Sequence, residues 1–196
     1  MAKLFGNLNL VVVVGFALAL AIMLGLDADS FGGTRQCITM TFVWLHVFFG
    51  ILWIGLLYYL NFVQVPTMPQ IPAEQKGAIT GHIAPRVFWY FRYGALFTVI
   101  TGLIVAWNGG VLHQAMSLMV PGKARLIGVG MWMALIMAFN VWFIIWPAQK
   151  KILGIVEATA EEKAAAAPRA LIASRTNLLL SIGMIYAMSA ANGIAG

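Results

Sequence analysis

Five long apolar stretches divide this sequence, and they constrain its fold more than any other feature. Each holds about 20 mostly apolar residues, the length that an α-helix needs to cross a hydrocarbon core about 30 Å thick. The stretches lie near residues 8–26, 41–63, 87–107, 126–146 and 171–192. The sequence therefore predicts an all-α integral membrane bundle of five transmembrane helices, forming a single transmembrane domain over residues 1–196.

The composition agrees with a lipid environment. Hydrophobic residues make up 62% of the chain and charged residues only 9%. In a water-soluble domain, about a quarter of all residues are charged. The first apolar stretch is longer than the core of a typical secretion signal, so we expect it to be retained as a helix.

The distribution of basic residues predicts the orientation of the helices, because short loops rich in Lys and Arg stay on the cytoplasmic side. The side that carries the N-terminus holds nine of the twelve: Lys3, Lys76, Arg86, Arg92, Lys150, Lys151, Lys163, Arg169 and Arg175. The other side holds Arg35, Lys123 and Arg125. We therefore expect the N-terminus inside and the C-terminus outside. The net charge of +6 is explained by this topology, and no nucleic-acid partner is expected.

Prolines indicate where the segments between the apolar stretches are interrupted. Four prolines in 64–86 are expected to prevent one continuous helix there, although 73–80 could form a short interfacial turn. The segment 147–170 predicts an extension of the fourth helix or a short surface helix. A helix formed by its run of strong helix formers, 157–167, is expected to end before Pro168.

The polar residues at membrane depth restrict the function. No Asp or Glu lies inside any of the five stretches, which argues against a carboxylate-driven proton pump or cation transporter. One histidine, His46, lies in the second stretch. The residues that share its helix face, at helical spacings, are Gly50, Trp53 and Leu57.

Two interpretations of His46 remain open. A neutral imidazole can be the axial ligand of a haem iron, and Gly50 one turn away would leave flat space for a porphyrin. Alternatively, His46 bonds a neighbouring helix, while Gly50 and Gly55 permit close helix packing. By depth in the membrane, His113 is the plausible second ligand and His82 is not; both also fit ordinary loop histidines.

Polar side chains converge in depth at the opposite, inner end of the bundle. They are Asn61, Gln64, Arg92, Asn140 and the run 174–177. Arg92 lies among aromatic residues, where its charge can stack on a ring or reach toward water. Arg92 and Arg175 have no intramembrane acid as a partner. They fit either interfacial anchoring or an anion pocket for haem propionates or a planar organic anion.

Several motifs carry a family resemblance. They are Trp44-Leu45-His46, Gly50, Trp53-Ile54-Gly55, Asn140-Val141-Trp142, Pro147, Gln149-Lys150-Lys151, Ser174 and Asn177. Together they resemble the membrane domain of the bacterial PuuD-type urate oxidases, over roughly residues 40–190. The resemblance implies a bundle in the bacterial inner membrane that is linked to oxidation chemistry, with a cytochrome c domain fused at the C-terminus of the full-length enzyme.

The chain departs from that family pattern in two ways. It ends at Gly196 and its one cysteine is Cys37, so we expect it to lack the cytochrome c domain and its Cys-x-x-Cys-His haem attachment. Where the pattern has intramembrane histidines, this sequence has Trp89, a histidine-free turn at 134–138, and Thr176. His46 remains, so we expect the scaffold to be kept and its chemistry to be reduced.

Two functions follow from these residues. The favoured interpretation is an accessory subunit that packs against other membrane subunits of a respiratory or redox complex. The alternative is a membrane redox protein that binds haem b, with His46 as axial ligand, with His113, Arg92 and Arg175 as candidate cofactor-binding residues, and with a separate c-type cytochrome as electron acceptor. A transporter ranks third.

Overall fold

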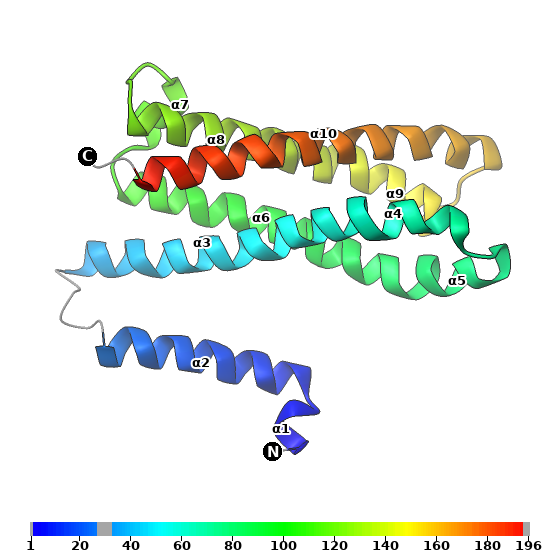
Figure 1. Ribbon diagram of the computed structural model, residues 1–196, viewed down its shortest axis with the longest axis horizontal. Coiled ribbons are helices and arrows are strands. Elements are labelled where there is room, and N and C mark those ends of the chain that lie inside the picture. The colour runs from blue at the N-terminus through cyan, green and yellow to red at the C-terminus, as the bar shows by residue number, and fades with distance from the viewer. Residues whose placement is uncertain (1, 27–32, 194–196) are drawn as a thin grey trace. The chain divides into compact units, whose positions relative to one another are not determined.

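A computed structural model describes residues 2–26 and 33–193 of the chain (Figure 1). The chain divides into two compact units, residues 1–40 and 41–196, which are considered separately. The first contains the short α1 (Ala2–Phe5), the apolar α2 (Leu8–Leu26) and the beginning of α3 (Thr34–Tyr58). The remaining helices belong to the second unit.

Helices account for nearly all of the second unit, in which long helices that alternate in direction are joined by short connections. After α3 the chain continues through η2 (Tyr59–Gln64), α4 (Val65–Thr67) and η3 (Met68–Gln70), then through η4 (Ala73–Gln75), α5 (Lys76–Ala78), η5 (Ile79–Ile83) and α6 (Ala84–Asn108). The last elements are α7 (Leu112–Ser117), α8 (Lys123–Phe139), η6 (Asn140–Ile145), α9 (Trp146–Ile152) and α10 (Ala160–Gly193).

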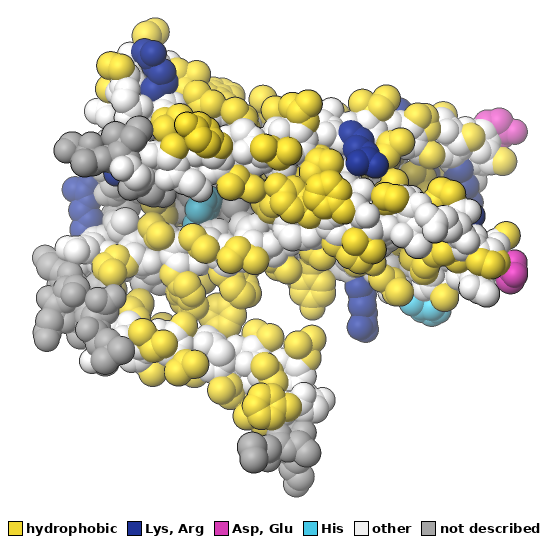
Figure 2. Space-filling model, in the orientation of Figure 1, with side chains coloured by type: hydrophobic (Ala, Val, Ile, Leu, Met, Phe, Trp, Pro, Cys, Tyr) yellow, Lys and Arg dark blue, Asp and Glu magenta, His cyan; other side chains and the backbone are white. Residues whose placement is uncertain are grey.

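The five predicted membrane spans are confirmed. Among the described residues, five helical stretches are long and apolar enough to cross a bilayer, and each overlaps one of the apolar runs that the sequence shows. The chain is therefore an all-α membrane protein. Figure 2 shows hydrophobic side chains along the length of the helices, with the visible carboxylates gathered at one end. The direction of insertion stays a prediction.

The prediction that no single continuous helix spans 64–86 is confirmed. Between the second and third spans the chain leaves helical geometry at Ile71 and Pro72, where the backbone is extended. Pro66, Pro85 and Pro147 each lie in the first turn of a helix that directly follows a π-helical segment. The wider π turn accommodates a residue that has no N–H and crowds the preceding carbonyl. Helices therefore continue through these three prolines.

The helix end expected before Pro168 is wrong. One helix, α10, runs from Ala160 through Pro168 to Gly193. On either side of the proline, Ala166 and Ala170 are buried against Ala148 of α9. This packing of small residues, together with the strong helix formers that precede Pro168, outweighs the loss of one backbone hydrogen bond.

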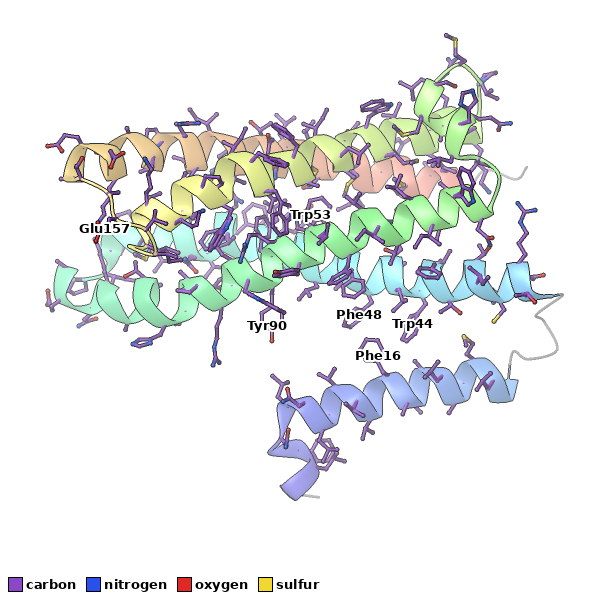
Figure 3. All side chains as sticks on the ribbon, turned by 180° about the vertical axis from the view of Figure 1, so that it is seen from behind. Phe16, Trp44, Phe48, Trp53, Tyr90 and Glu157 are labelled. Carbon is purple, nitrogen blue, oxygen red and sulfur yellow. The ribbon has the colours of Figure 1, made fainter. Side chains whose placement is uncertain are left out.

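The core of the second unit lies where α3, α6, η6 and α10 meet. Trp53, Leu57, Phe91, Met137 and Val141 are fully buried there. Trp53 points into the bundle, whereas Tyr90 points away from it (Figure 3).

Close helix packing depends on a glycine of α6 in this core. A Cβ on Gly94 would lie 3.3 Å from the backbone nitrogen of Trp53. The close approach expected at Gly55 is not found, since no described atom lies within 4 Å of where its Cβ would be.

Candidate functional site

A cavity of about 350 Å³ lies between the helices of the second unit. Its walls come from α3, α6, α8 and α10, with Val111 between α6 and α7 closing one side. The lining is mostly apolar, and its polar side chains are those of His46, Thr98 and Ser189. A cavity of this size and composition is typical of small-molecule and cofactor sites.

His46 is the residue in this cavity best suited to bind a metal. Its Nδ1 lies 2.8 Å from the carbonyl oxygen of Thr98 on α6. Because a carbonyl oxygen only accepts hydrogen bonds, Nδ1 carries the hydrogen, and in the neutral ring Nε2 keeps a free lone pair. Nε2 has no hydrogen-bond partner among the described residues. A backbone carbonyl that fixes the tautomer in this way is the usual support of a metal-ligating histidine.

A glycine of α6 provides the space for the imidazole. A Cβ on Gly102 would lie 2.7 Å from Cε1 and 3.0 Å from Nδ1 of His46. Gly50, which the sequence predicts to provide this space, has Thr98 Cγ2 at 3.9 Å as its nearest neighbour and does not line the cavity as the structure describes it. The glycine that makes room for the imidazole therefore belongs to α6.

Replacing Gly102 with alanine is expected to displace the imidazole and break its bond to Thr98. The loss should destabilise the protein by about 1 kcal/mol, and any metal-centred ligand should bind about tenfold more weakly or worse. Thermal unfolding in detergent and ligand occupancy measure the two effects. Gly50→Ala is the matched control, and an equal response of the two variants would contradict this role for Gly102.

The other two histidines do not join His46. His113 lies on α7 and is exposed, and His82 lies in η5 and is also exposed. Within the described part of the chain, neither lines the cavity. His113 therefore has no support from these contacts as a partner of His46, and the described residues hold no group of three His, Cys, Asp or Glu side chains placed to bind a metal.

Two methionines line the cavity instead, and sequence reasoning missed them. Met131 of α8 is 8% exposed, and Met188 of α10 lies beside it in the same apolar cluster. A thioether can ligate soft metals, including haem iron. The available signal was the spacing of Ile127, Met131 and Leu135, four residues apart along one helix.

The arginines proposed as cofactor partners lie elsewhere. The Cζ atom of Arg92 lies 3.6 Å from the centre of the Trp146 ring, and its Nε donates a hydrogen bond to the Phe88 carbonyl at 3.2 Å. Of the two arrangements expected for this charge, the structure has the one in which it stacks on an aromatic ring. Arg175 is exposed on α10. Among the residues that the structure describes, neither arginine lines the His46 cavity.

The polar side chains predicted to converge at the inner end do meet in part. Asn61 donates to Ser174 Oγ at 2.9 Å, and Asn140 donates to Asn177 Oδ1 at 2.9 Å. Asn177 also donates to the Met137 carbonyl at 3.0 Å. These bonds connect η2 and η6 to α10 in the interior of the bundle, where interhelical amide bonds hold membrane helices together.

Replacing Asn177 with leucine is expected to leave the Asn140 amide buried without its acceptor. The expected cost is about 1–2 kcal/mol of stability, the upper range for interhelical hydrogen bonds in membranes. The control is Thr176→Val, since Thr176 is exposed and its hydroxyl bonds the Ile172 carbonyl of its own helix. Unfolding midpoints in detergent should fall for the first variant alone; equal midpoints would argue against a stabilising bond.

Comparison with known proteins places this bundle in a family. A family model described as urate oxidase N-terminal matches residues 93–192, about half of the chain. No curated protein and no solved structure matches the chain. The matched region includes Gly102, Met131 and the Asn140–Asn177 pair, while His46 precedes it. The resemblance seen in the sequence is confirmed: the chain belongs to the urate oxidase N-terminal family.

Proposed function

We propose that this chain is a membrane redox protein that binds haem b, with His46 as an axial ligand of the iron. The observation that carries the proposal is the state of His46 in its cavity. Nδ1 is held by the Thr98 carbonyl at 2.8 Å, and Nε2 is left available beside an apolar space of about 350 Å³. An oriented neutral imidazole and apolar walls are the features that a haem pocket requires.

The two propionate groups of a haem need a cationic partner, and neither Arg92 nor Arg175 lines the cavity as the structure describes it. Lys123 begins α8, and Ile127, four residues later, lines the cavity. Residues four apart share a helix face, so Lys123, which is exposed and outside the described lining, lies on the same face of α8 as Ile127. We therefore assign the propionate-binding role to Lys123 rather than to Arg92 or Arg175.

A haem in this position supplies one-electron transfer. The residues of the chain would hold and tune it: His46 binds the iron, Thr98 orients His46, and the apolar walls exclude water. We propose the bacterial inner membrane as the location and a separate c-type cytochrome as the electron partner. Family membership and the five membrane helices support this setting without identifying the partner.

A second candidate is an accessory subunit that packs within a larger respiratory or redox complex. The observation in its favour is the use of buried polar side chains in helix packing. Asn61 donates a hydrogen bond to Ser174, and Asn140 donates one to Asn177, in both cases across helices. Polar side chains that join helices in this way suit a structural subunit.

Extraction of the chain from its native membrane in mild detergent tests both candidates. The haem proposal predicts a visible spectrum with a Soret band and about one haem per chain. The accessory proposal predicts a colourless chain that co-purifies in fixed ratio with other membrane subunits. A colourless chain without haem would overturn the first proposal whether or not partners are present.

A further inference from the structure

We propose that the thioether sulfur of Met131 is the second axial ligand of the haem. The inference rests on the proposed function, because it assumes a haem bound through His46. It adds the identity of the group on the opposite side of the cofactor, and with it a His/Met coordination.

The positions of the two side chains along α6 support this pairing. His46 of α3 packs against Gly102, and Met131 of α8 belongs to one buried cluster with Ala106 and Ala115. Gly102 and Ala106 are four residues apart, so about one helical turn, or about 6 Å, separates them along α6. Both residues line the same cavity from different helices. A flat ring between them would have an imidazole on one face and a thioether on the other.

The chemistry of the cavity favours a neutral second ligand. Its lining as described holds no carboxylate, thiolate or second imidazole. A thioether carries no charge and no proton, so it can be buried among apolar groups at little cost. Methionine opposite histidine also raises the reduction potential of a haem, which suits an electron carrier.

Met188 is the less suitable of the two methionines. A Cβ on Gly130 would lie 2.9 Å from Cε and 3.2 Å from Sδ of Met188. Its side chain therefore lies directly on the backbone of α8. Met131 lines the cavity from α8 and is the thioether we assign to the iron.

Spectroscopy of four variants of the full chain tests the assignment. Met131→Leu removes the sulfur at similar volume, and such swaps usually cost less than about 1.5 kcal/mol. Met188→Leu removes the neighbouring thioether. Met137→Leu is the matched control, because Met137 is fully buried on the same helix but lies in the core away from the cavity. Met131→His restores a ligand of another type. Size-exclusion chromatography checks that each variant is folded.

The visible spectrum of the reduced protein, before and after carbon monoxide is added, gives the result. The wild type, Met188→Leu and Met137→Leu should be six-coordinate, low-spin and unreactive. Met131→Leu should keep its haem, become high-spin and bind one carbon monoxide per haem. Met131→His should stay six-coordinate with a lower midpoint potential.

Three results would overturn the proposal. They are a carbon monoxide-reactive wild type, a Met131→Leu spectrum identical to that of the wild type, and an unchanged midpoint potential in Met131→His. The last result keeps the test decisive if the leucine variant does not fold. A wild type that binds no haem would instead refute the proposed function itself, so the two failures are distinguishable.

Discussion

His46→Ala should yield a folded membrane protein that has lost its haem absorption. The substitution removes the nitrogen proposed to bind iron and leaves the Thr98 carbonyl without the donor that lies 2.8 Å away. Loss of a residue that merely orients a metal ligand costs about 10–100-fold in affinity, so loss of the ligand itself should cost more than about 100-fold. The measurement is the ratio of Soret to protein absorbance after purification.

His113→Ala and His82→Ala are the matched controls for that experiment. Both side chains are exposed and lie outside the cavity lining as described. Their haem content should equal that of the wild type. Retention of full haem content by His46→Ala would contradict the role of His46 as an iron ligand. Loss of haem in His113→Ala would instead support the pairing of His46 with His113 that depth in the membrane suggested.

Gly128→Ala should be the most destabilising small substitution in the second unit. The added Cβ would collide with the Ala115 carbonyl oxygen and would lie 2.8 Å from its carbon and 2.7 Å from Leu118 Cδ2. The first two atoms belong to the backbone of α7, so no side-chain rotation relieves the contact. Overpacking of this kind costs about 3 kcal/mol. Thermal unfolding in detergent should show a clearly lower midpoint.

The cavity should also be affected, because α7 begins directly after Val111 and packs on α8. Haem occupancy in Gly128→Ala is therefore expected to fall with stability. Gly55→Ala provides the control, since no described atom lies within 4 Å of its Cβ position. Alanine has the higher helix propensity, so Gly55→Ala should be neutral or slightly stabilising. Equal midpoints for the two variants would contradict the packing described for α7.

The sequence predicted those features that depend on one helix at a time. Apolar length alone located five spans, and helical spacing placed Trp53 and Leu57 on the buried face of α3. The depth of polar residues placed Asn61, Asn140 and the run 174–177 at one level of the bundle, where the structure pairs Asn61 with Ser174 and Asn140 with Asn177. The depth of a residue in the bilayer follows from its position along a single helix, so it can be predicted from the sequence.

Features that depend on the arrangement of several helices were not predictable in the same way. Depth put His113 near His46, but α7 leaves His113 exposed. The glycine beside the imidazole proved to be Gly102 of α6, 56 residues from His46, rather than Gly50 of the same helix. Methionine is common in apolar helices, so the spacing of Ile127, Met131 and Leu135 did not distinguish Met131 until the cavity showed which residues line it. The rotation of each helix about its own axis decides these contacts.

The helix end predicted before Pro168 was the other error, since α10 continues through that proline, and other prolines of the chain also lie inside continuous helices. Each of Pro66, Pro85 and Pro147 follows a π-helical segment, which provides the room that an α-helical turn lacks. A sequence pattern predicts that proline interrupts a helix. It does not indicate that a wider turn ahead of the proline allows the helix to continue.

Titration of haem b into the detergent-solubilised, haem-free chain tests the central claim most directly. The account predicts saturation at one haem per chain, a low-spin spectrum at the end point, and no saturable binding to His46→Ala under the same conditions. Absence of saturable binding to the wild type, or equal binding to the two proteins, would contradict it.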